Sequence, residues 1–244
     1  MSLYEKKYNH LIKKIGFDDQ KLLNELKLFN PDFVINCFCN FKFEKILKNF
    51  ETYNVHLSFL PQYRGRHPLH WAIINGEIEH GITIHRMNEK FDCGEIIWQK
   101  KVEIKFEDSA KTLRKRLMNK LKSNIDKIVE LMIYKNYPII KNNSQRLKYA
   151  RRRLPKDNQI KNFTSYNTVH NFIRSLSDDD NLAFVEINDN LYYLRKVEIF
   201  EKNNQIKNLS KKFIIKEDEI YTVCDDGTPI KLLINKKKYK SNRI

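Results

Sequence analysis

The stretch from Asp32 to Phe59 constrains the fold most, because two short apolar runs enclose one amphipathic run. DFVINCF (32–38) is nearly continuous in apolar residues, a pattern typical of a strand that is buried on both faces of a sheet. KFEKILKNF (42–50) predicts a helix, and YNVHLSF (53–59) predicts the next strand. Strand, helix and strand in this order predict a parallel sheet with crossover connections, so we expect an α/β protein.

The segments on either side extend this prediction to residue 140. Apolar residues recur at helical spacing in residues 18–30 and stop at Pro31. The remaining elements expected in a first domain of residues 1–140 are a short helix in HPLHWAIINGE (67–77), strands in GITIHRM (81–87) and EIIWQKKVEI (95–104), and one long helix from about Ala110 to Tyr134 with Asp108 and Ser109 as caps.

Residues 141–244 predict a second, smaller unit. A polar connection with Pro155 leads to a helix near Thr168 to Leu176. Five alternating segments then predict a small antiparallel β unit: AFVEI, NLYYLRKVEIF, KKFIIK, EIYTVCD and PIKLLI. Small antiparallel units often leave an edge to cover, so we expect a homodimer.

Composition excludes several classes of protein. With 41% hydrophobic and 31% charged residues in 244, the chain is globular, and it has no apolar window of the roughly 18 residues that a membrane span needs. The first 17 residues lack the apolar core of a secretory signal. Four cysteines are too few for a disulfide scaffold and lack zinc-like spacing. We therefore expect a cytoplasmic protein without a metal site.

The net charge of +16, from 46 Lys and Arg against 30 Asp and Glu, favours an anionic ligand. Nucleic acid, a nucleotide sugar and a folate polyglutamate all satisfy this condition. The basic tail NKKKYKSNR (235–243) is interpreted as a solvated end.

Asn54 and His56 are the first candidate site residues. Side chains at i and i+2 leave a strand on the same face, and ligands of open α/β sheets bind beyond the carboxyl ends of the strands. Asp92 follows in a stretch that holds four of the six glycines. An amide and an imidazole can stabilise an oxyanion, and a carboxylate can take a proton from an amine, so the three suit acyl transfer to an amine. An isolated Asn-x-His is, however, more often a cap or a surface pair.

Three longer motifs carry a resemblance to a family. NVHLSFLPQYRGRHP, then WAIINGE followed by GITIHRM, then DCGEII are similar to the signature of the formyltransferases that use 10-formyltetrahydrofolate, over residues 31–135. The family includes glycinamide ribonucleotide, methionyl-tRNA and nucleotide-sugar N-formyltransferases. The resemblance implies a Rossmann-like, mostly parallel sheet shortened at the N-terminus, followed by a small antiparallel β-rich domain. Residues 153–177 show weaker similarity to the start of the family's C-terminal domain.

The resemblance also implies site residues. The family's catalytic Asn, His and Asp fall on Asn54, His56 and Asp92. The pterin of 10-formyltetrahydrofolate would be bound largely by backbone groups of two loops, which assigns cofactor binding to Phe38, Cys39, Asn40, Phe41, Glu89, Lys90 and Phe91.

The acceptor is predicted from a few residues that resemble sugar N-formyltransferases more than tRNA ones. These residues are Arg64, Gly65, Arg66, His67 and His85, and Arg151 and Arg152 are added as candidates for holding a nucleotide. The expected acceptor is a nucleotide-linked amino sugar, such as a dTDP-4-amino-4,6-dideoxyhexose for O-antigen or another surface polysaccharide. Methionyl-tRNA is the alternative acceptor, and a shortened relative that serves as a basic binding module is a third interpretation.

Overall fold

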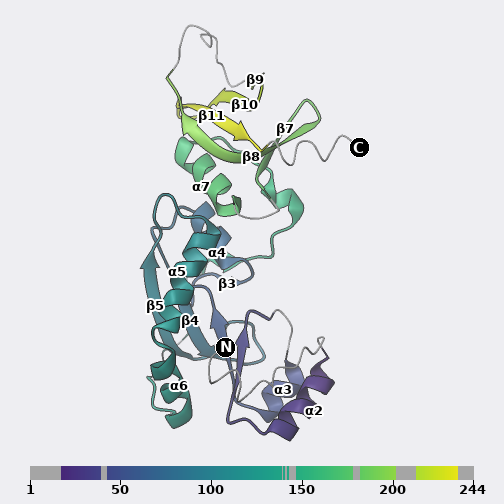
Figure 1. Cartoon of the computed structure of the whole chain (residues 1–244), viewed down its shortest axis with the longest axis vertical. Coiled ribbons are helices and arrows are strands. Elements are labelled where there is room, and N and C mark those ends of the chain that lie inside the picture. Colours follow the sequence, from purple (N-terminus) through teal and green to yellow (C-terminus); the bar gives the residue numbers. More distant parts are fainter. Residues whose placement is uncertain are drawn as a thin grey trace, which may run out of the picture.

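The structure is a computed structural model that describes residues 18–39, 43–138, 140, 142, 147–177, 182–201 and 213–235. Helices and strands are interspersed up to residue 134, and strands dominate after residue 183 (Figure 1). The elements are α2 (Asp19–Phe29), β1 (Val34–Cys37), α3 (Glu44–Asn49), β2 (Thr52–His56), β3 (Arg64–Gly65), α4 (Pro68–Ile74), β4 (Glu79–Arg86), β5 (Ile96–Glu103), α5 (Ala110–Lys122), α6 (Ile125–Tyr134), β6 (Tyr149–Ala150), a 3₁₀ turn (Pro155–Asn158), α7 (Tyr166–Leu176), β7 (Phe184–Ile187), β8 (Asn190–Ile199), β9 (Ile214–Lys216), β10 (Glu219–Val223) and β11 (Pro229–Ile234).

The first sheet has the order β1-β2-β4-β5 and confirms the α/β class. β1 and β2 are parallel, as the strand–helix–strand pattern predicts, with Asn36 opposite Asn54. The expected mostly parallel sheet is confirmed, since β1, β2 and β5 run in the same direction, and β4 is the one strand that runs antiparallel to its neighbours β2 and β5. The link from β4 to β5 contains no helix, whereas a parallel pair needs a crossover of about a dozen residues or more. β4 is antiparallel to β2 as well, with His56 opposite Thr83.

The prediction of one long helix from Ala110 to Tyr134 is wrong, because the helix is interrupted at Ser123 and Asn124. The Ser123 hydroxyl and the Asn124 amide both donate to the carbonyl oxygen of Lys120. Short polar side chains that bond to nearby backbone groups compete with the helix in this way. At the N-terminus, the predicted Ser109 cap is confirmed, since its hydroxyl accepts from the N–H of Thr112.

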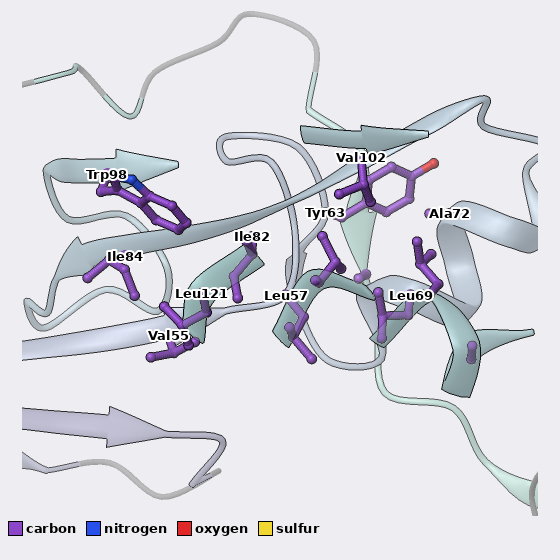
Figure 2. Close-up of a cluster of buried hydrophobic side chains, with 14 of the residues drawn as sticks. Val55, Leu57, Tyr63, Leu69, Ala72, Ile82, Ile84, Trp98, Val102 and Leu121 are labelled. Carbon is purple, nitrogen blue, oxygen red and sulfur yellow. The ribbon is translucent and has the colours of Figure 1, made fainter. Parts of the chain in front are cut away.

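The main core lies between the first sheet and helices α4 and α5. Val55, Ile82 and Ile84 come from the sheet, and Leu69 and Ala72 from α4 (Figure 2). The apolar face of α5 closes the core through Leu113, Leu117 and Leu121. Val55 thus points into the core, and because side chains alternate along a strand, Asn54 and His56 face the other side.

A second core lies under the sheet β7-β8-β11-β10-β9, in which every pairing is antiparallel. The expected antiparallel β unit is therefore confirmed. α7 contributes Val169 and Ile173 to this core, and it also contacts α4 and α5 of the first unit (Figure 1). Division of the chain near residue 140 stays a prediction, which the two separate cores support.

The remaining local predictions are confirmed in outline: α2, α3, α4, α7 and the five late strands lie where the patterns place them. The sequence analysis did not predict the short parallel pair β3–β6, which joins Arg64 and Gly65 to Tyr149 and Ala150. No helix in the described ranges is long and apolar enough to cross a membrane. Residues 236–243 of the basic tail lie outside the described residues.

Candidate active site

The three predicted catalytic side chains converge at the carboxyl end of β2. The Nδ2 atom of Asn54 lies 3.4 Å from Oδ1 of Asp92, and Nδ1 of His56 lies 3.6 Å from the same oxygen. Asn54 and His56 are 8% and 7% exposed, and the side chain of Asp92 is 11% exposed. An amide, an imidazole and a carboxylate thus share one nearly buried polar cluster.

A second asparagine fixes the orientation of the Asn54 amide. Nδ2 of Asn36 donates to Oδ1 of Asn54 at 2.9 Å, which turns the Asn54 NH₂ group toward Asp92 and His85. Nε2 of His85 lies 3.2 Å from Asn54 Nδ2. Nδ1 of His85 donates to the carbonyl oxygen of Arg86, so Nε2 is the ring nitrogen that is left to accept from the Asn54 amide. Both hydrogens of the Asn54 amide therefore have partners.

His56 is held with one ring nitrogen facing the cluster. Its Nε2 lies 2.9 Å from the carbonyl oxygen of Tyr63, and a carbonyl only accepts, so Nε2 carries the hydrogen. Burial lowers the pKa of His56 below its ordinary value of 6.5, although the neighbouring Asp92 carboxylate acts in the opposite direction. At neutral pH the ring is consequently neutral, and its Nδ1 lone pair points to the side of Asp92.

Asp92 is kept ionised by its surroundings. Burial by itself would raise the pKa of this carboxyl, but polar neighbours that include the His56 ring and the backbone N–H of Gly65 outweigh it and lower the pKa to about 2. The Gly65 N–H donates to Oδ2 at 2.8 Å. The backbone of Asp92 has a φ of 52°, in the left-handed region that few non-glycine residues adopt. A carboxylate with so low a pKa attracts a cation or an N–H group but stores a proton poorly.

These groups line a cavity of about 1060 Å³. Apolar side chains and the loop of residues 88–91 form one part of its lining: Phe38, Phe43, Leu47, Met87 and Phe91. Basic and imidazole side chains form another part: Arg66, His67, His70 and Arg152. The cavity therefore offers surfaces for a flat apolar ligand and for an anionic ligand around one polar cluster.

The structure brings most of the predicted site residues to this cavity. Its lining includes the predicted residues Phe38, Cys39, Glu89, Lys90, Phe91, Gly65, Arg66, His67, His85 and Arg152. Asn40 and Phe41 lie outside the described residues. Arg64 and Arg151 are absent from the lining: the guanidinium of Arg64 binds Asn142, and that of Arg151 binds both carboxylate oxygens of Asp157 at 2.7 and 2.8 Å.

Two details differ from the roles expected for these residues. The backbone N–H and C=O of Cys39 are both bonded to the side chain of Asn36, so Cys39 has little backbone capacity left for a ligand. His85 is 2% exposed and contacts Asn54 and Asp92, which makes it a member of the polar cluster as well as a lining residue.

The sequence analysis missed Asn36 and Arg114. A signal for Asn36 was available, because it is a polar residue near the end of a predicted apolar strand, and the structure places it opposite Asn54. Arg114 lies on α5 and lines the cavity, and its guanidinium is 4.7 Å from the centre of the Phe38 ring. Its place on a helical surface among other Lys and Arg residues carries no comparable signal.

Comparison with known proteins identifies the family. A sequence profile described as formyl transferase matches residues 4–128, just over half of the chain. Methionyl-tRNA formyltransferase of Malacoplasma penetrans is 35% identical over 206 residues, which cover 80% of this chain and 64% of that protein. The chain therefore spans less than two thirds of this relative.

Solved structures share the fold. An N-formyltransferase from Helicobacter canadensis, in complex with folinic acid and dTDP-3-aminofucose, superposes with a TM-score of 0.68 at 24% identity, over 96% of this chain and 83% of that one. A variant of HypX from Aquifex aeolicus gives a TM-score of 0.68 at 16% identity, over 90% and 39% of the two chains. With the profile match and the shared fold together, this chain belongs to the formyl transferase family.

Proposed function

We propose that this chain transfers the formyl group of 10-formyltetrahydrofolate to the amine of a nucleotide-linked amino sugar. The first candidate acceptor is a dTDP-4-amino-4,6-dideoxyhexose. The observation that carries the proposal is the convergence of Asn54, His56 and Asp92 on one side of a large cavity. Membership of the family and the folinic acid in the Helicobacter canadensis structure support the choice of donor.

The lining of the cavity fits a folate donor on its apolar side. The cavity of about 1060 Å³ is at the upper end of the ~300–1,000 Å³ that is usual for ligand pockets, as expected for a site that holds a donor beside an acceptor. Phe38 and Phe91 would hold a pterin ring, with backbone groups of residues 88–91 at its edge. When bound, 10-formyltetrahydrofolate supplies an activated formyl group, and the residues of the polar cluster would move the proton and stabilise the formyl oxygen.

Asp92 and His56 would together remove the proton from the attacking amine. The ionised Asp92 accepts a hydrogen bond from the amine N–H and stabilises the positive charge that develops as the nitrogen attacks. Because the pKa of Asp92 is about 2, the carboxylate releases that proton readily to the stronger base beside it, Nδ1 of His56 at 3.6 Å. His56 then carries hydrogens on both ring nitrogens, and Asp92 stabilises the imidazolium.

Asn54 would stabilise the formyl oxygen as it gains negative charge, and His56 would add to this once it has received the amine proton. The 3.4 Å bond from Asn54 to Asp92 is the longer of the two that its amide donates, so that hydrogen is the one expected to turn toward the oxygen. One such donor contributes about 3 kcal/mol to the transition state. The new Nδ1–H of His56 supplies a second donor, and it can later return its proton to the departing nitrogen.

The acceptor would bind on the basic side of the cavity. Arg66 and Arg152 line that side, and guanidinium groups pair well with the oxygens of a diphosphate. His67 and His70 stand beside them, with ring centres 5.6 Å apart, and they provide hydrogen-bonding groups for sugar hydroxyls. The bulk and charge of these side chains favour a compact anionic acceptor.

The test is a formylation assay on the purified chain with 10-formyltetrahydrofolate and one acceptor at a time. Release of tetrahydrofolate with a formylated dTDP-4-amino sugar supports the proposal, and the 3-amino isomer is tested in parallel. Methionyl-tRNA is the second candidate acceptor, because the relative with 35% identity is a methionyl-tRNA formyltransferase. Absence of product from every amine would identify a binding module instead.

Variants identify the site in the same assay. Asp92→Asn should abolish turnover while leaving donor binding measurable by fluorescence, because it removes the charge and not the cavity. Asp126→Asn makes the same chemical change at an exposed position on α6 and should leave turnover unchanged. A role in surface-polysaccharide synthesis and a homodimeric state stay predictions, and sedimentation analysis tests the second.

A further inference from the structure

The side chain of Asn142 bonds to the loop that carries Asp92. Its Nδ2 atom donates to the carbonyl oxygen of Asp92 at 2.8 Å and to that of Gly94 at 2.9 Å. Both hydrogens of the Asn142 amide therefore bond to carbonyl oxygens of the same turn. Neither bond involves the Asp92 carboxylate itself, so Asn142 acts on the backbone that sets where the carboxylate lies.

Arg64 holds Asn142 in place. Its Nη2 atom donates to Oδ1 of Asn142 at 3.0 Å and also to the carbonyl oxygen of Asn142. Arg64 lies on β3, whose next residue, Gly65, donates its N–H to Oδ2 of Asp92 at 2.8 Å. One two-residue strand thus supports Asp92 twice: Gly65 bonds to the carboxylate, and Arg64 acts on the loop backbone through Asn142.

The conformation of Asp92 explains why such support is needed. A non-glycine residue in the left-handed region persists only where the surroundings hold it, and Asp92 has a φ of 52°. His56 and His85 approach its Oδ1 only to 3.6 Å, so they do not fix the loop by close hydrogen bonds. The bonds of 2.8 and 2.9 Å from Gly65 and Asn142 are the shorter ones.

We propose that Arg64 and Asn142 are positioning residues that set the place of Asp92, although neither lines the catalytic cavity. The role in turnover rests on the proposed function. Arg64 then belongs to the support of the proton-transfer group and not to the substrate contacts that its Arg-Gly motif suggests. Asn142 comes from the connection between the two units, so that connection takes part in building the active site.

Kinetic analysis of two substitutions at residue 142 tests the proposal. Asn142→Ala removes both bonds to the loop, and a displacement of about 1 Å at a reacting group can lower the rate on the order of 100-fold. We expect kcat to fall by about 10- to 100-fold, with the KM of donor and acceptor unchanged. Asn142→Asp keeps the shape and the acceptor for Arg64 but cannot donate to the carbonyls, so its kcat should fall at least as far.

The matched control is Leu147→Ala, which changes a 43% exposed side chain of the same connection and should leave kcat unchanged. Arg64→Ala should lower kcat in the same direction as Asn142→Ala, and the double variant should be no worse than Asn142→Ala alone, because both act through one bond network. Thermal unfolding of each variant separates a loss of folded protein from a loss of turnover.

A readout that does not depend on turnover separates this proposal from the proposed function. NMR titration of the Asp92 side-chain carboxyl should give a pKa of about 2 in the unaltered chain and a pKa closer to 3.8 in Asn142→Ala, since displacement weakens the bond from Gly65. If the chain transfers no formyl group but the pKa of Asp92 still changes in Asn142→Ala, the proposed function is refuted and the positioning role stands. An unchanged Asp92 pKa, or an Asn142→Asp variant with full kcat, would overturn the positioning role.

Discussion

Substitution of Asn36 by aspartate should impair the site by changing the orientation of the Asn54 amide. In the structure, Nδ2 of Asn36 donates to Oδ1 of Asn54 at 2.9 Å, while Oδ1 of Asn36 accepts from the N–H of Cys39 at 3.0 Å. The ionised carboxylate of the Asn36→Asp variant has the same shape and keeps the bond from the N–H of Cys39, but it only accepts, so it loses the bonds to Oδ1 of Asn54 and to the carbonyl oxygen of Cys39. The Asn54 amide then gains a hydrogen bond to the carboxylate if it rotates its NH₂ group toward residue 36. This rotation leaves the amide oxygen of Asn54 facing Asp92.

The size of the effect follows from the bond that forms in the rotated state. A hydrogen bond to a charged group contributes about 1.5–3 kcal/mol, and the bonds to Asp92 and His85 that rotation gives up reduce this gain, so the population of the two amide orientations shifts by at most about 10- to 100-fold. Only the original orientation presents a donor to the formyl oxygen. We therefore expect Asn36→Asp to lower kcat by up to about 100-fold with little change in KM.

The assay measures kcat for the best acceptor at pH 8 with saturating 10-formyltetrahydrofolate. The alkaline pH is needed because burial raises the pKa of a carboxyl group, and a protonated residue 36 could donate again. Asn54→Asp provides the reference for loss of the donor itself. Asn119→Asp, an exposed position on α5, controls for the added charge. Full kcat in a folded Asn36→Asp variant, beside a large loss in Asn54→Asp, would refute this account of how Asn54 is oriented.

Three further predictions follow from the same geometry. Neutral His56 is the proposed proton acceptor, so kcat at saturating substrates should be constant near neutral pH and should fall as the pH drops through the pKa of His56. That pKa lies below 6.5 in the folded protein. A midpoint of the kcat profile above 6.5 would contradict this role of His56. Gly94→Ala should lower the free energy of unfolding by about 1–3 kcal/mol in urea titrations, because a Cβ at residue 94 would lie 1.7 Å from the carbonyl oxygen of Arg86. An unchanged free energy of unfolding would show that the backbone can shift to accommodate the methyl group at no cost. Arg152→Ala should raise the acceptor KM about tenfold with kcat and donor KM unchanged. Lys156→Ala, a substitution at an exposed neighbouring position, should leave all three constants unchanged.

Local features of the sequence predicted the elements well. The apolar spacing in residues 18–30 and the stop at Pro31 locate α2, and Ser109 locates the start of α5, because caps and periodicity act within one or two turns of the chain. The same local reasoning failed at Ser123 and Asn124, where side-chain bonds to the backbone of the preceding turn interrupt a continuous apolar face.

The sequence by itself determined that Asn54 and His56 share one face, since alternation along a strand requires it, and the family motif pointed to Asp92. Only the tertiary structure decided the direction of β4 and the partners of the three groups. Asn36 lies 18 positions from Asn54, and Arg64 lies 78 positions from Asn142, so their bonds depend on strand register and on the path of the connection. Periodicity carries no information over such separations, because contacts between distant segments are set by how whole elements pack.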